Sequence, residues 1–243
     1  MKIQDYQVKV RSSMQYLMCL VQSKNKRRKN GCSWPLNFYW VASWVVTFIE
    51  LIIICVIYLP FVFDTYSIGF GITIATLFAF FIIGITYLDL RCMLADPTEP
   101  LIFERLENNQ HLEYECEDWN WVVMKATKHW KVWNRCVKDF DHHWKWLNNC
   151  IGYNNYRTFL VLMIIYVVYN FYFLSMSLWF WIEANENQVV KNVIPARVVV
   201  LMIMISKIVI TLLTSWLLIF HIYLAWIGLS TYEFIINRRN NKK

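Results

Sequence analysis

Four long apolar stretches, separated by polar segments, dominate the pattern of this 243-residue chain. Each can cross a bilayer, because a membrane helix needs about 20 mainly apolar residues. The pattern predicts helices over residues 38–63, 66–88, 158–182 and 198–229. Four crossings place both termini on the same side of the membrane. We therefore predict an all-α membrane protein with four transmembrane helices and one sizeable polar domain between the second and the third.

Lysine and arginine indicate which side is cytosolic, because they are enriched in the short loops on that side. Eight precede the first stretch, nine lie between Arg91 and Arg157, and four follow the last stretch. The connection 183–197 holds two and the connection 64–65 none. We expect cytosolic termini and a cytosolic middle domain. The predicted parts are an N-terminal segment 1–37, helices one and two 38–90, the middle domain 91–157, helices three and four 158–229, and a C-terminal tail 230–243.

Composition agrees with a membrane protein, since 58% of the residues are hydrophobic and 18% aromatic. The net charge is +7, but the excess clusters at the membrane edges, so we do not expect a nucleic-acid partner. The basic run 24–29 is explained by contact with anionic lipid, at about 1 kcal/mol per basic residue. Steering of an anionic substrate is the alternative.

Few titratable residues interrupt the predicted helices. Glu50 lies in the first, and Lys207 and His221 lie in the fourth. Such residues are functional candidates by default. Lys207 and His221 lie toward the ends of a long helix, however, which favours side chains that reach the membrane interface. For Glu50 a functional and a structural role both stay open.

The middle domain holds four of the five histidines. Two prolines in "RCMLADPTEP" end the second helix, and "LIFERLENNQHLEYE", residues 101–115, is compatible with a short strand or helix. From Cys116 onward no helical or strand period persists, so something other than an apolar face must organise the segment. Metal ligation is the usual substitute where thiols stay reduced. The candidate ligands are Cys116, His129, Cys136, His142, His143 and Cys150.

The spacing of these residues resembles that of the DHHC-type protein S-acyltransferases, or palmitoyltransferases. The cysteine-rich domain of that family reads C-x2-C-x9-H-C-x2-C-x2-C-x4-D-H-H-C-x5-C. "ADPTE", "NNCIGYNNYRTF" and "STYE" are similar to further family motifs in the same order, with Thr98 at a family glycine. Aligned without a gap, the cysteine-rich pattern falls on Cys116, Trp119, His129, Trp130, Trp133, Cys136, Asp141, His142, His143, Trp144 and Cys150.

The resemblance implies an acyl transfer in two steps. A cysteine at the membrane surface takes a fatty acyl group from acyl-coenzyme A, then passes it to a cysteine of a cytosolic or membrane protein. Position 144 would be the nucleophile, with His142 as its base and Asp141 orienting that base. The acyl chain would lie between the four helices. The implied location is a multi-pass protein of the endomembranes (ER or Golgi) or the plasma membrane, in contact with membrane lipid.

The resemblance also implies two structural zinc ions, each held by three cysteines and one histidine. The first set, by position, is Cys116, Trp119, His129 and Cys136. The second set is Trp130, Trp133, His143 and Cys150. The fold class that the resemblance implies is thus four membrane helices with a cytosolic, zinc-binding, cysteine-rich domain between the second and the third.

The chain departs from the family at four cysteine positions, which carry Trp119, Trp130, Trp133 and Trp144. Indole has one N–H donor and no lone pair for a metal or an acyl group. The first set keeps three ligands, the second two, and the nucleophile is missing. Either an aromatic core replaces the metal, at a cost in steric strain, or the four residues are cysteines in the native protein.

The uniform replacement favours the second hypothesis, because independent losses would scatter over several residue types. The codon UGA is read as cysteine in some genetic codes and as tryptophan in others, which would produce this pattern. Two function classes follow: an S-acyltransferase if position 144 is cysteine, and a catalytically inactive membrane adaptor or scaffold if Trp144 is genuine. A channel or transporter is disfavoured, because no paired or broken polar helices mark a path.

Overall fold

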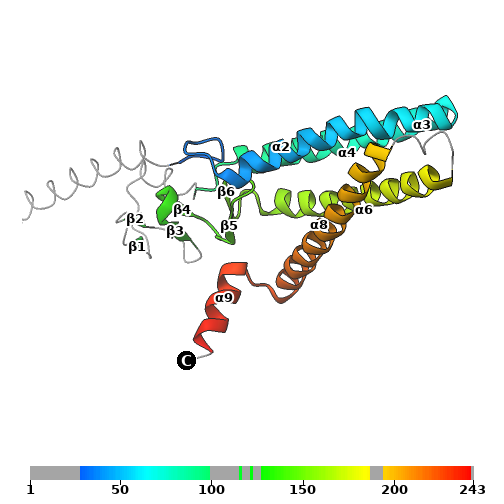
Figure 1. Cartoon of the computed structure of the whole chain (residues 1–243). Helices are drawn as coiled ribbons and strands as arrows, with labels where there is room; N and C mark the ends of the chain where they lie inside the picture. The colour runs from blue at the N-terminus through cyan, green and yellow to red at the C-terminus, as the bar shows by residue number, and fades with distance from the viewer. Residues whose placement is uncertain (1–27, 99–114, 117–120, 123–126, 187–193, 242–243) are drawn as a thin grey trace, which may run out of the picture. The chain divides into compact units, whose positions relative to one another are not determined.

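The computed structural model describes residues 28–98, 115–116, 121–122, 127–186 and 194–241 (Figure 1). The candidate Trp119 lies outside these residues, as do most of the basic run 24–29 and nearly all of the segment 101–115. The chain divides into two compact units. The cysteine-rich unit comprises Met1–Leu36 and Met93–Tyr156, and the membrane unit comprises Asn37–Cys92 and Arg157–Lys243.

Among the described residues, four helices are long and apolar enough to span a membrane, which confirms the predicted fold class. The first runs through α2 (Phe38–Ile53), a π-helical turn η1 (Ile54–Tyr58) and α3 (Leu59–Thr65). The others are α4 (Ile68–Leu94), α6 (Tyr156–Glu186) and α8 (Ile194–Ile227). Apolar length alone predicted these four spans. The larger part of the cysteine-rich unit, Met93–Tyr156, lies between the second and third span in the sequence.

The π-helical turn η1 ends two residues before Pro60. Proline has no N–H to offer the helical ladder, and a π turn is one way for a helix to accommodate such a break. None of the residues Phe38–Ile53 of α2 is buried, whereas Ile54, Tyr58, Phe61 and Val62 beyond it are. The two halves of the first span therefore differ in packing.

Aromatic rings fill the interior of the membrane unit. Tyr58 contacts the edge of Phe173 with ring centroids 5.4 Å apart, and Phe61 meets Phe180 at 4.7 Å. The Tyr58 hydroxyl lies 2.6 Å from the Ser177 hydroxyl, so the buried phenol has a hydrogen-bond partner. These contacts join the second half of the first span to α6.

Two titratable residues of the fourth span are buried. Lys207 and His221 are each 1% exposed. His221 packs against Phe159 with ring centroids 5.1 Å apart, and Lys207 pairs with Glu50. For Lys207 the prediction of a side chain that extends to the interface is therefore wrong, because its partner lies inside the bundle.

"STYE" begins a further helix, α9 (Thr231–Asn240), after the fourth span. The Glu233 N–H donates to the Ser230 hydroxyl at 3.2 Å, and the Ser230 N–H donates to the Glu233 carboxylate at 2.9 Å. This reciprocal pair is a capping box, which satisfies N–H groups that a helix start leaves without partners.

The cysteine-rich unit is built from short antiparallel hairpins (Figure 1). Strand β1 (Glu115–Cys116) pairs with β2 (Trp121–Val122), β3 (Lys128–Trp130) with β4 (Arg135–Val137), and β5 (His142–Trp144) with β6 (Asn149–Ile151). A 3-10 turn, η2 (Lys131–Trp133), connects β3 to β4. Sequence periodicity did not reveal these strands, because two or three residues are too few for an alternating pattern.

Two of the hairpins enter their second strand through an asparagine in the left-handed region. Asn134 precedes β4 with φ 47°, and Asn148 precedes β6 with φ 49°. Asparagine adopts this conformation more readily than most residues with a side chain. The hairpins β3–β4 and β5–β6 thus share a left-handed asparagine directly before the second strand.

Gly31 fastens the segment before the first span to the cysteine-rich unit. Its N–H donates to the Met93 carbonyl at 2.8 Å, and its carbonyl accepts from the Asn148 side-chain amide at 2.6 Å. A Cβ atom here would lie 2.5 Å from both the Leu147 carbonyl oxygen and the Met93 Cγ. Glycine is therefore required by the close approach of three chain segments.

We expect Gly31→Ala to destabilise the protein by about 1–3 kcal/mol, the usual cost of forcing atoms into a packed site. Gly84→Ala in α4 is the matched control, because nothing lies within 4 Å of its added Cβ. The measurement is the unfolding midpoint of the full chain in detergent. Equal midpoints for the two variants would contradict the close contact.

Candidate functional site

Asp141 and His142 form a hydrogen-bonded pair at the start of β5. The Asp141 Oδ2 and His142 Nδ1 atoms are 2.5 Å apart, and the carboxyl-bearing residue is 3% exposed. The Asp141 N–H donates to the Ile151 carbonyl at 2.9 Å, which fixes the backbone. A carboxylate at Nδ1 holds the proton on that nitrogen and leaves Nε2 as the basic one.

Trp144 lies two residues beyond His142 on the same strand. Successive side chains of a strand point to opposite faces, so residues two apart share one face. The His142 and Trp144 rings are 5.5 Å apart at 79°, an edge contact. The three predicted catalytic residues thus lie together, with position 144 beside the imidazole. The indole itself offers no nucleophile.

His143 points to the other face of β5 and meets the candidate metal ligands of the second set. It pairs across the hairpin with Cys150, and its Nδ1 lies 3.6 Å from the Cys150 Sγ. Trp130 stacks on the His143 ring at 5.5 Å, and Trp133 contacts its edge at 5.2 Å. All four positions of the second set therefore converge on one point, although they come from two different hairpins, β3–β4 and β5–β6.

The first set is described in part. His129 pairs with Cys136 across the β3–β4 hairpin, and its Nδ1 lies 3.5 Å from the Cys136 Sγ. Cys116 lies in β1, but its side chain is outside the described structure, as is the whole of Trp119. The hairpins β3–β4 and β5–β6 thus each bring one histidine and one cysteine together.

The two histidine–cysteine pairs have the spacing of ligands that share a zinc ion. Zinc lies about 2.3 Å from sulfur and about 2.0 Å from nitrogen in a tetrahedral site, which separates the two ligand atoms by about 3.6 Å. Both pairs fit that value. The second set as a whole does not fit, because Trp130 and Trp133 have no lone pair for the ion. Two ligands alone do not make a structural zinc site.

Two guanidinium groups flank Trp133, which is 2% exposed. The Arg28 and Arg135 groups lie 3.8 Å and 4.5 Å from the ring. Burial, and then the charges of Arg135 and Arg28, lower the pKa of His143 to about 4. His143 is therefore neutral at physiological pH, the state in which imidazole binds a metal.

Burial raises the pKa of the Cys150 thiol, and the positive charge of Arg135 opposes that shift. Arg135 itself is fully buried, and it donates to the carbonyls of Arg28 and Lys29 at 3.2 and 3.1 Å. The surroundings of the second set are thus positively charged. Positive charge favours thiolate over thiol and suits an anionic cluster of thiolates.

Asn149 holds the hairpin that carries the catalytic candidates. Its amide nitrogen donates to the carbonyls of Met93 and Ala95 at 3.1 and 2.9 Å. Its oxygen accepts from Arg135 at 2.7 Å and from the Cys150 N–H at 2.9 Å. Asn149 is opposite Trp144 in the register of the hairpin, so it ties position 144 to the chain that leaves α4.

Sequence reasoning missed the roles of Asn149 and Arg135. "NNC" was visible as part of a motif, but nothing local indicated that the second asparagine bonds to residues 54 and 56 positions earlier. Arg135 lies beside a candidate ligand and was counted only as a positive charge. Long-range hydrogen bonds of this kind leave no periodic signal in a single sequence.

Comparison with known families gives one match. The sequence profile of the DHHC palmitoyltransferase family matches residues 108–238, which is more than half of the chain. The matched part includes the three hairpins, α6, α8 and most of α9. No curated protein matches the chain.

We expect Asn149→Ala to destabilise the cysteine-rich unit by about 1–3 kcal/mol or more, because it leaves several buried groups without their hydrogen bonds. Asn154→Ala is the control, since that side chain makes one exposed hydrogen bond, to the Asp96 carbonyl. Limited proteolysis of the full chain measures the difference as faster cleavage within residues 127–155. Equal cleavage of the two variants would show that Asn149 does not hold the hairpin.

Proposed function

Because the chain belongs to the DHHC palmitoyltransferase family, we propose that it is a protein-cysteine S-acyltransferase that uses acyl-coenzyme A as its acyl donor. The observation that carries the proposal is the Asp141–His142 pair, whose imidazole faces position 144. That arrangement suits a base that activates a thiol on the neighbouring residue. The proposal requires cysteine at position 144 in the native protein.

The proposed reaction has two thiol-exchange steps. His142 takes the proton of the thiol at position 144, and the thiolate attacks the carbonyl carbon of the acyl thioester. The bond from that carbon to the coenzyme A sulfur breaks, and the leaving sulfur takes the proton from His142. In the second step a substrate cysteine loses its proton to His142 and attacks the acyl carbon. The bond from that carbon to the sulfur at position 144 breaks, and that sulfur takes the proton back from His142. No oxidant or reductant is needed.

Three observations support cysteine at positions 119, 130, 133 and 144. All four family cysteine positions that differ carry the same residue. Trp130 and Trp133 occupy the point where His143 and Cys150 meet, so the geometry of a four-ligand set persists around them. The buried indole nitrogen of Trp130 has no hydrogen-bond partner among the described residues, an arrangement that costs free energy.

Zinc would have a structural role in this proposal. With cysteine at positions 119, 130 and 133, each set would contain four ligands. Zinc bound there would cross-link hairpins that are too short to fold on an apolar core, contributing about 10–16 kcal/mol as in small metal-dependent modules. The acyl transfer itself uses only Asp141, His142 and position 144.

A catalytically inactive adaptor or scaffold is the second candidate. Trp133 is 2% exposed, lies between two guanidinium groups, and contacts His143. Such a ring is well placed as part of an aromatic core that substitutes for a metal. In that case position 144 is tryptophan and the chain does not form an acyl thioester.

The remaining elements of the proposal follow from the membrane spans. We infer cytosolic termini from the distribution of lysine and arginine, and a location in the endomembranes or the plasma membrane. The acyl chain would lie against the apolar faces of the four helices. The partners would be proteins with cytosolic cysteines, acyl-coenzyme A and membrane lipid.

We expect peptide mass spectrometry of the native protein to find cysteine at position 144. The tryptic peptide 139–145 contains this position alone among the four. Trp146 in the next peptide is the internal control, because it matches a tryptophan of the family and should read as tryptophan. Tryptophan in both peptides, or UGG codons at positions 119, 130, 133 and 144, would exclude the transferase and leave the scaffold.

We also expect the full chain in detergent to take a label from an alkyne-bearing acyl-coenzyme A. Hydroxylamine should release that label, because it cleaves thioesters. His142→Ala should slow labelling by about 10²–10⁴-fold, the usual contribution of a general base, and Asn154→Ala should not. Label that resists hydroxylamine, or an unchanged rate in His142→Ala, would count against the proposed roles.

A further inference from the structure

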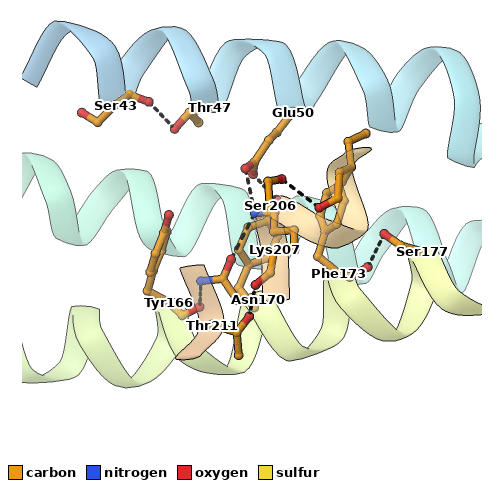
Figure 2. Close-up of polar contacts among 12 residues, drawn as sticks. Ser43, Thr47, Glu50, Tyr166, Asn170, Phe173, Ser177, Ser206, Lys207 and Thr211 are labelled. Carbon is orange, nitrogen blue, oxygen red and sulfur yellow. Dashed lines mark hydrogen bonds and ion pairs between the residues drawn. The ribbon is translucent and has the colours of Figure 1, made fainter. Parts of the chain in front are cut away.

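The first and fourth membrane spans are joined by an ion pair inside the membrane unit. The Lys207 Nζ lies 2.7 Å from the Glu50 Oε1, and Figure 2 shows the two side chains meeting between α2 and α8 beside α6. The two side chains are 2% and 16% exposed. At this distance, and with both groups shielded, the Coulomb attraction within the pair is stronger than in an exposed pair, and the loss of hydration of both charges opposes it.

Neighbouring residues of α6 complete the coordination of both charges. The Lys207 ammonium donates to the Asn170 side-chain oxygen at 3.1 Å and lies 5.0 Å and 4.7 Å from the Tyr169 and Phe173 rings. The Tyr169 hydroxyl donates to the second carboxylate oxygen of Glu50 at 3.1 Å. Each charge therefore has a partner of opposite sign and further polar or aromatic contacts.

The groups around the pair are themselves oriented (Figure 2). The Asn170 amide nitrogen donates to the Tyr166 carbonyl at 2.9 Å, which turns its oxygen toward Lys207. The Thr211 hydroxyl donates to the Lys207 carbonyl at 2.6 Å. Three helices thus supply a prearranged polar cluster rather than an accidental contact of two long side chains.

The depth of the pair determines what each charge costs on its own. Glu50 is twelve residues beyond the start of a 28-residue span, and Lys207 is ten residues beyond the start of a 31-residue span. At about 1.5 Å of rise per residue, neither side chain is near a membrane surface. A charge at such a depth is costly unless it is paired.

We propose that the Glu50–Lys207 pair is an intramembrane clamp that closes the bundle only when the fourth helix is in place. The first helix carries a carboxylate whose partner lies 157 positions later in the chain. Until α8 packs against α2 and α6, both charges are uncompensated in the membrane. This role is separate from the proposed chemistry, because Asp141, His142 and position 144 take no part in the cluster.

The test compares single and double variants of the full chain in detergent. Glu50→Leu and Lys207→Met should each lower the unfolding midpoint by about 10 °C, since breaking a buried pair leaves one uncompensated charge. The double variant Glu50→Leu/Lys207→Met should recover most of that loss, because it leaves no charge. Ser206→Ala is the matched control in α8, since its hydroxyl is exposed and bonds to the Ile203 carbonyl of its own helix.

If a single variant does not fold, its unfolding midpoint cannot be measured. The yield of monodisperse protein in size-exclusion chromatography is then compared instead. A lower midpoint or yield in both single variants, with recovery in the double variant, supports the clamp. Single variants no worse than Ser206→Ala would overturn it. So would losses that add in the double variant, or a double variant that yields no more folded protein than the singles.

Discussion

The alternation of side chains along the three residues of β5 separates two kinds of chemistry. His142 bonds to the Asp141 carboxylate and contacts the residue at position 144, whereas His143, between them in sequence, faces Cys150 and the two tryptophans. Adjacent histidines therefore do not compete for the same partners. The pairing of β5 with β6 fixes this division, because a shift of one residue would exchange the two faces. Asn149, opposite position 144, holds that register against the end of α4.

Charge and hydrogen bonding also differ between the two faces of β5. On the face that carries His143 and Cys150, burial and then the charges of Arg135 and Arg28 lower the pKa of His143, and the same two charges oppose the effect of burial on the Cys150 thiol. On the other face the buried Asp141 carboxylate fixes the tautomer of His142. The first arrangement suits binding of a cation by neutral imidazole and thiolate, and the second suits removal of a proton.

The sequence predicted the membrane helices well, because their signal is a length of apolar residues that needs no partner. The closeness of Asp141, His142 and position 144 was also predictable, since neighbours in sequence come close in any strand. Their catalytic roles stay a prediction. The hairpins were not, because strands of two or three residues show no period. The pairing of Lys207 with Glu50 was missed for a different reason. A position near a helix end favours a side chain that extends to the interface, and only the folded bundle reveals a carboxylate from the first helix.

The π-helical turn before Pro60 has a consequence for how the first span meets its surroundings. A helix advances about 100° per residue, and the extra residue of a π turn rotates everything beyond it by about that angle. The face that α2 offers is therefore not continued by α3. Ile54, Tyr58, Phe61 and Val62 turn into the protein, while most apolar side chains of α2 stay exposed and Glu50 meets Lys207. One span thus consists of two segments, the first held to the bundle by a polar contact and the second by aromatic packing.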